Sequence, residues 1–121
     1  MRTRYVLATA IAIAAAAGAV FVRYKSELGQ ARDAATLGSL IAVTTAGPIE
    51  YAEEGTGVPL LSIHGAGGGF DQGLANAAGL AGDGLRVIAP SRFGYLGTPV
   101  PADASPAAQA HAHAALLSAL N

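Results

Sequence analysis

The hydrophobic positions of this chain fall into two patterns. Residues 5–22 form one run without a charged residue, which predicts a single hydrophobic helix. After residue 40 the apolar residues come in short runs separated by turn residues, which is typical of a folded domain. The stretch between them is polar and indicates a spacer. The pattern therefore divides the chain into residues 1–25, 26–39 and 40–121.

The domain pattern predicts a hairpin followed by alternating strands and helices. Residues 40–45 are rich in β-branched side chains, and residues 49–53 alternate like a strand with one face in water. A turn at residues 46–48 would join them as an antiparallel hairpin. The later elements are a strand at 60–63, a helix at 72–81, a strand at 85–89 and a helix that Ser105 caps and Pro106 begins. Gly73 and Gly79 weaken the first of these helices. This order favours an α/β fold with parallel strands.

The N-terminal run is long enough to cross a bilayer. As a helix, residues 5–22 would extend over roughly 27 Å. The run fits a signal anchor that stays in the membrane. It also fits a cleaved signal peptide, because small residues suited to cleavage lie within it, and cleavage would give a secreted protein. The basic residues Arg2 and Arg4 at the N-terminus favour a single-pass orientation with the domain outside the cytoplasm.

Composition removes several function classes. The formal net charge is −1, so nothing in the charge balance indicates a nucleic-acid partner. The chain has no cysteine, which excludes disulfide scaffolds, thiolate metal sites and cysteine nucleophiles. His111 and His113 are two positions apart and would point about 200° apart on a helix, which does not suit one metal ion. We therefore expect no metal and no cofactor.

The stretch most informative about chemistry is the glycine-rich loop that begins at His64. Four of the five residues at 65–69 are glycine, so the backbone can approach a ligand closely. At the carboxyl end of a parallel strand such a loop can hold a phosphate or stabilise an oxyanion.

The phosphate alternative fits few residues. A dinucleotide fingerprint, G-x-G-x-x-G, matches Gly65 and Gly67 but has Phe70 at its third glycine. Ser91 and Arg92 after the next strand would suit only a cofactor with a 2′-phosphate. An NADP-binding Rossmann-like fragment is therefore a minor alternative.

The order of the motifs resembles the N-terminal part of the α/β-hydrolase fold superfamily. The loop at 64–68 is similar to the family's H-G-x-G-type loop after its third strand, and residues 49–59 are similar to the second strand and its turn. Residues 90–98 are similar to an Asp-x-Arg-Gly-x-Gly-x-Ser-like loop beside the pocket, without its acidic residue. The resemblance covers residues 40–121. It implies the N-terminal portion of an α/β-hydrolase sheet, a β-hairpin then β-α-β-α, preceded by one hydrophobic helix.

The resemblance also implies roles for single residues. The backbone N–H groups of Ala66 and Gly67 would form the oxyanion hole, which stabilises the negative charge on a carbonyl under attack. His64 and Gly65 would support this loop, because the family's triad histidine comes far downstream. The possible pocket residues are Phe70, Arg92 and Tyr95.

The sequence contains no nucleophile elbow. G-x-S-x-G should follow the strand after the helix that begins at Pro106, and neither it nor the later acid and triad histidine occur before Asn121. We therefore expect a fragment of a membrane-associated serine hydrolase or esterase, inactive alone, for a small ester-like substrate. The same loop serves dehalogenases, epoxide hydrolases and peptidases, so the reaction stays open. The alternative is a non-catalytic, small membrane-anchored protein with a hydrolase-like binding segment.

Overall fold

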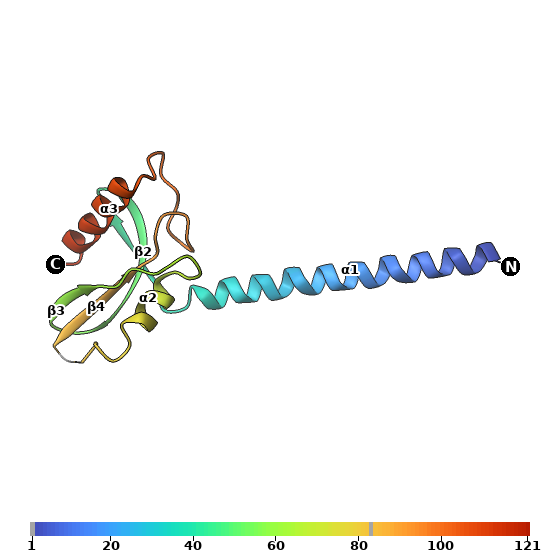
Figure 1. Cartoon of the computed structure of the whole chain (residues 1–121), viewed down its shortest axis with the longest axis horizontal. Helices are drawn as coiled ribbons and strands as arrows, with labels where there is room; N and C mark the ends of the chain where they lie inside the picture. The colour runs from blue at the N-terminus through green and yellow to red at the C-terminus, as the bar shows by residue number, and fades with distance from the viewer. Residues whose placement is uncertain (1, 83) are drawn as a thin grey trace. The chain divides into compact units, whose positions relative to one another are not determined.

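The computed structural model describes residues 2–82 and 84–121 (Figure 1). They divide into two compact units, Met1–Ala34 and Ala35–Asn121, which are described separately. The elements in chain order are α1 (Arg2–Ala35), β1 (Leu40–Thr44), β2 (Gly47–Gly55), β3 (Val58–Leu61), α2 (Phe70–Asn76), β4 (Leu85–Pro90) and α3 (Pro106–Ala119).

Helix α1 is continuous over its 34 residues. It includes the predicted hydrophobic run and extends through the spacer as far as Ala35, because the spacer contains no proline that would end a helix. The part Tyr5–Ala35 holds a window with a mean hydropathy of 2.2 and is long and apolar enough to cross a membrane. Signal sequences near an N-terminus share this length and composition, so α1 fits both an anchor and a signal peptide.

The domain is built on a four-stranded sheet with the order β1-β2-β4-β3 (Figure 1). β1 and β2 form the predicted antiparallel hairpin, β2 runs antiparallel to β4, and β3 runs parallel to β4. The predicted order of a hairpin followed by strand, helix, strand and helix is confirmed. Among the described residues β3 has a strand partner only on its β4 side, so the strand that leads into the glycine-rich loop lies at the edge.

Helices α2 and α3 cover opposite faces of this sheet. On one face Ile49 and Ile88 pack with Leu116 of α3, and on the other Ala52 and Ala89 pack with Phe70 of α2. Alternate residues of a strand point to opposite faces, so both faces of β2 are covered between residues 49 and 52. The prediction of one wet face on this strand is therefore wrong.

The hairpin turn and β3 lie earlier in the chain than predicted. Gly47, with φ +100°, already begins β2, and the Thr44 hydroxyl donates to its carbonyl oxygen at 2.8 Å. β3 ends at Leu61, although the N–H of Ser62 still donates to the carbonyl oxygen of Ile88 at 2.9 Å. The Ser62 hydroxyl donates to the Gly73 carbonyl oxygen at 2.6 Å, which ties the end of this strand to α2.

Helix α2 is shorter than predicted and begins earlier, because its glycines serve packing and termination. A Cβ at the buried Gly73 would lie 2.7 Å from the Ser62 carbonyl oxygen and 2.9 Å from the Ala89 Cβ. The missing side chain at position 73 thus lets α2 lie directly on the sheet. Gly79 has φ +87° and belongs to the turn after the helix, where a glycine is favoured.

Replacing Gly73 with alanine tests this contact. Gly73→Ala is expected to lower the free energy of unfolding by about 1–3 kcal/mol, because backbone and Cβ atoms must move to make room. Urea denaturation of the full chain in detergent micelles, followed by circular dichroism, measures the change. Gly67→Ala is the matched control, because a Cβ there meets nothing within 4 Å. Equal stability of the two variants would contradict the packing argument.

Candidate functional site

Two loops meet at the carboxyl ends of β3 and β4. The first, residues 62–69, joins β3 to α2, and the second, residues 91–105, joins β4 to α3. β3 and β4 are parallel neighbours, so both loops leave the sheet at the same edge, where ligands bind in open α/β sheets.

His64 lies buried between these loops and bonds to both of them. Its Nε2 lies 2.9 Å from the backbone nitrogen of Arg92. A backbone N–H only donates, so Nε2 is the acceptor, and Nδ1 carries the proton that it donates to the Gly65 carbonyl oxygen at 2.7 Å. Both ring nitrogens of a neutral His64 are thus occupied, which is the geometry that a loop-supporting residue needs.

Gly65 is held from both sides. Its N–H donates to the Gln72 side-chain oxygen at 2.7 Å, and its carbonyl oxygen also accepts from Nη2 of Arg92 at 2.9 Å. A Cβ at Gly68 would lie 2.5 Å from the Cβ of Gln72, so the loop packs closely on α2. The first and last parts of the loop are therefore fixed.

Three consecutive N–H groups in the middle of this loop stay open. The hydrogen bonds among the described residues give no acceptor to the backbone nitrogens of Ala66, Gly67 and Gly68. The donors on either side are satisfied, since Gly69 donates to Asp71 at 2.9 Å. Ala66 and Gly67 are the residues that the sequence singled out as donors, and Gly68 joins them.

The loop's place in the sheet does not fit a dinucleotide fold. A Rossmann-like fragment would carry the glycine loop after the first strand of a parallel sheet. Here β1 and β2 precede the loop, and β2 runs antiparallel to β4. The minor alternative of an NADP-binding fragment is therefore wrong in its fold.

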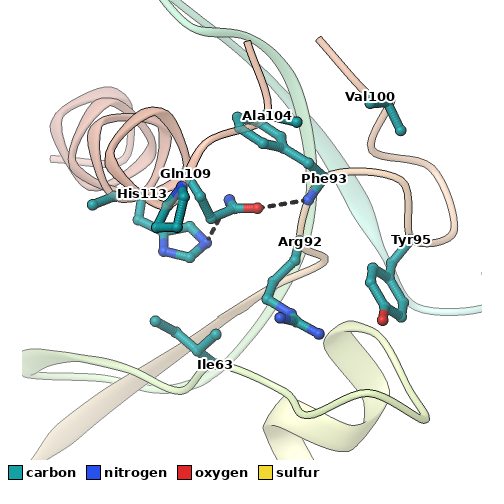
Figure 2. Close-up of a pocket in the computed structure, with 10 residues that line it drawn as sticks. Ile63, Arg92, Phe93, Tyr95, Val100, Ala104, Gln109 and His113 are labelled. Carbon is teal, nitrogen blue, oxygen red and sulfur yellow. Dashed lines mark hydrogen bonds between the residues drawn. The ribbon is translucent and has the colours of Figure 1, made fainter.

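A hollow of about 470 Å³ lies beside the glycine-rich loop (Figure 2). Its lining residues are Ile63, Arg92, Phe93, Tyr95, Val100, Ala104, Pro106, Gln109, Ala110 and His113. Tyr95 also borders a second hollow, which Ala66, Gly67 and Gly68 line, and its hydroxyl donates to the Ala66 carbonyl oxygen at 3.3 Å. Two of the three possible pocket residues, Arg92 and Tyr95, thus line the hollow, whereas Phe70 is 3% exposed and lies in the core under α2.

The side-chain amide of Gln109 on α3 bonds both to His113 on the same helix and to Phe93 in the second loop (Figure 2). Gln109 accepts the N–H of Phe93 at 2.8 Å with its side-chain oxygen, so its NH₂ group faces Nε2 of His113 at 3.0 Å. That nitrogen must be an acceptor, and His113 is neutral. Burial lowers the pKa of His113, and the nearby His64 and Arg92 lower it further.

Glu50 is a buried carboxylate that sequence reasoning missed. It is 1% exposed and accepts hydrogen bonds from the Ser39 hydroxyl at 2.9 Å, the Ser91 hydroxyl at 2.7 Å and the Gly97 N–H at 2.9 Å. Ser91 in turn accepts the N–H of Phe70, the first residue of α2, at 3.1 Å. Glu50 therefore links the second loop to the end of the glycine-rich loop. Nothing in the strand pattern distinguishes Glu50 from a solvent-facing residue, because its partners come from distant positions.

Similarity to known proteins comes from solved structures. No family model and no curated protein matches the chain. An alpha/beta hydrolase fold protein from Nakamurella multipartita shares 41% identity and a TM-score of 0.64 over 68% of this chain and 28% of its own. An epoxide hydrolase from an endophytic Streptomyces shares 27% identity and a TM-score of 0.59, with 69% and 27% covered. A thermophilic esterase from Thermogutta terrifontis, solved with malate bound, shares 33% identity and a TM-score of 0.54, with 68% and 32% covered. The chain therefore spans about 30% of the length of these proteins.

Glu50 should be essential for stability. Glu50→Ala removes the acceptor for the Ser91 hydroxyl and the Gly97 N–H, and one of the two acceptors of the Ser39 hydroxyl, which lowers the free energy of unfolding by about 2–4 kcal/mol. Urea denaturation of the full chain measures it. Glu54→Ala, an exposed carboxylate on the same strand, is the control and should change the stability by less than about 0.5 kcal/mol. A similar small effect at both positions would contradict the role of the buried network.

His113 should make the domain less stable in mild acid. Its pKa is lowered in the folded state, so the unfolded chain binds the proton more tightly. Stability is therefore expected to fall as the pH drops through the unfolded value of about 6.5 toward the folded pKa. Urea denaturation between pH 7.5 and 5 should show a smaller loss in His113→Gln than in the parent chain. The control is His111→Gln, exposed on the same helix. If both variants show the parent's pH dependence, His113 is not its source.

Proposed function

Because the chain belongs to the α/β-hydrolase fold superfamily and carries the N-terminal portion of that fold, we propose that it is the front part of a membrane-associated serine hydrolase of the esterase type. The observation that carries the proposal is the row of open N–H groups at Ala66, Gly67 and Gly68. These donors stand in a loop that is fixed at both ends, at the edge of the sheet where ligands bind.

The open donors suit acyl transfer. When a nucleophile attacks an ester carbonyl, the oxygen gains negative charge, and N–H groups already in place stabilise it by about 3–4 kcal/mol per donor. Ala66 and Gly67 present such donors next to an apolar hollow that can hold the acyl or alcohol group of an ester. His64 acts as the buried link that orients them, since neither of its ring nitrogens is free to take a proton from a nucleophile.

The nucleophile in this proposal lies outside the 121 residues. The sequence contains no G-x-S-x-G motif, and the chain spans about 30% of the length of the similar structures. We propose that a later segment supplies the elbow, the acid and the triad histidine. Helix α1 would hold the enzyme at a membrane, with the domain outside the cytoplasm.

A non-catalytic role is the second candidate. The hollow that Arg92 and Tyr95 line, which a ligand could enter, is the observation that favours it. In this case the domain would be a small membrane-anchored module that binds a ligand in the hollow at Arg92 and Tyr95 without reacting with it.

The coding sequence that follows codon 121 decides between the two candidates. The hydrolase proposal expects a continuous reading frame with a strand, G-x-S-x-G and then a later acid and histidine. An in-frame stop directly after Asn121 would contradict it and leave the binding module.

In the elbow-bearing product, the donors can be tested one at a time. Gly67→Pro removes an N–H group and is expected to lower kcat for a short p-nitrophenyl ester by about 10²–10³-fold, with little change in KM. Gly67→Ala keeps the N–H group and has open space for its methyl group, so it reports the effect of a side chain alone. Equal kcat values for the two variants would mean that Gly67 is not an oxyanion donor.

A further inference from the structure

We propose that Gln109 and His113 form a proton-sensitive latch on the second loop. The latch holds the N–H group of Phe93 against α3 while His113 is neutral, and it releases this group when His113 takes up a proton. It therefore couples the conformation of the second loop to pH in mild acid. The inference goes beyond the proposed function and does not rest on it, because it concerns the loop and α3 whatever they bind.

The orientation of the Gln109 amide is fixed by Phe93. A backbone N–H only donates, so the side-chain atom that lies 2.8 Å from the Phe93 nitrogen is the amide oxygen. The NH₂ group of the same amide then lies 3.0 Å from Nε2 of His113 (Figure 2). An NH₂ group also only donates, so this hydrogen bond exists only while Nε2 carries no proton.

A protonated His113 cannot keep this arrangement. Once Nε2 carries a proton, two donors face each other. If the amide turns over, its oxygen accepts from His113, but its NH₂ group then faces the N–H of Phe93, which is again a donor. One hydrogen bond of Gln109 is lost in either orientation. The bond to the cation is the stronger of the two, so the bond to Phe93 is the one that breaks.

The groups around His113 determine the direction of the pH response. The titratable and charged groups on the described elements that pack against α3 are His64, Arg92, Tyr95, Tyr51, Arg86 and Glu53. Burial is the largest cause of the lowered pKa of His113, and His64 and Arg92 lower it further. Arg86 is paired with Glu53 and bonds to Leu120 at the far end of the helix, and a raised pKa keeps Tyr51 neutral in acid. None of these groups stabilises a buried cation at position 113.

The proton therefore favours the released state. A His113 that has left its buried place binds the proton more tightly than the latched one does, since burial lowers its pKa. As the pH falls through the ordinary value of about 6.5 toward the lowered pKa, the population of the released state rises. Above this range the latch stays closed.

The release can reach the glycine-rich loop without unfolding the domain. Arg92 precedes Phe93, and it bonds to His64 through its N–H and to Gly65 through Nη2, both at 2.9 Å. A change at Phe93 is therefore passed to the loop that carries the open donors. The side chain of Phe93 still packs on the core cluster that includes Leu116 of α3, which keeps α3 on the sheet.

Hydrogen exchange tests the latch directly. The full 121-residue chain in neutral detergent micelles is followed by ¹H–¹⁵N NMR between pH 7.5 and 5, and each exchange rate is divided by that of an unstructured chain at the same pH. The protection of the Phe93 amide is expected to fall by about fivefold, which corresponds to the loss of one ordinary hydrogen bond. The amides of Ala66 and Gly67 should shift with the same midpoint as the His113 ring. The Ile88 amide, on the strand that is paired on both sides, should keep its protection.

Variants separate the latch from other effects of acid. His113→Gln keeps an acceptor that does not titrate, so Phe93 should stay protected at pH 5. His111→Gln, exposed on the same helix, is the matched control and should behave like the parent. Gln109→Glu should reverse the response, because a carboxylate accepts from both Phe93 and a protonated His113. In this variant Phe93 stays protected at pH 5 and the pKa of His113 rises.

Three results would overturn the inference. The first is a Phe93 protection that does not change in the parent chain while the His113 ring titrates. The second is a loss that occurs together with that of Ile88, since the domain then unfolds as a whole. The third is an equal loss in Gln109→Glu and the parent. All three are read without His113→Gln, so they hold even if that variant does not fold, and none depends on the coding sequence after codon 121.

Discussion

The domain depends on one buried carboxylate. Glu50 sits on β2 and takes part in neither of the ion pairs recorded for the described residues; it accepts hydrogen bonds from Ser39, Ser91 and the N–H of Gly97. A buried carboxyl group is costly unless its oxygens are hydrogen-bonded, so Glu50 and its hydrogen-bond partners must keep their positions relative to one another. The Ser91 hydroxyl donates to Glu50 and accepts the N–H of Phe70, the first residue of α2, so it links Glu50 to the start of that helix. Glu50 thus helps to position the second loop and the end of the glycine-rich loop.

The open donors of the glycine-rich loop are meaningful because the surrounding polar groups are satisfied. His64 uses both ring nitrogens, and the N–H and carbonyl oxygen of Gly65 are both bonded. Against this background the unpaired N–H groups at 66–68 and the unpaired Nε of Arg92 are exceptions on the same side of the domain. Ala66 and Gly67 are exposed, so their N–H groups are open to solvent and to a ligand.

The fold could be predicted from the sequence, whereas the site could be predicted only in part. Periodicity and turn residues predicted the hairpin and the strand–helix alternation, and Ser105 caps α3 as expected, since its side chain accepts from Ala108. The glycine-rich loop could be predicted because a run of glycines is typical of a sharp turn or of a backbone that approaches a ligand closely. Glu50 was missed because its burial depends on hydroxyls 11 and 41 positions away. Gly73 was misjudged because its value lies in contact with β4, which no local propensity includes.

The strand order has a kinetic consequence. The β1–β2 hairpin is local, and all of its pairs lie between residues 40 and 51. β3 follows directly in the chain, yet its sheet partner is β4, whose pairing with Val58–Leu61 requires residues 85–88. The partners that fix the glycine-rich loop come later still: the Ser91 hydroxyl accepts the N–H of Phe70, and the N–H of Arg92 donates to His64. The pairing of β3 and the contacts that fix the glycine-rich loop therefore require residues 85–92 to have been synthesised first.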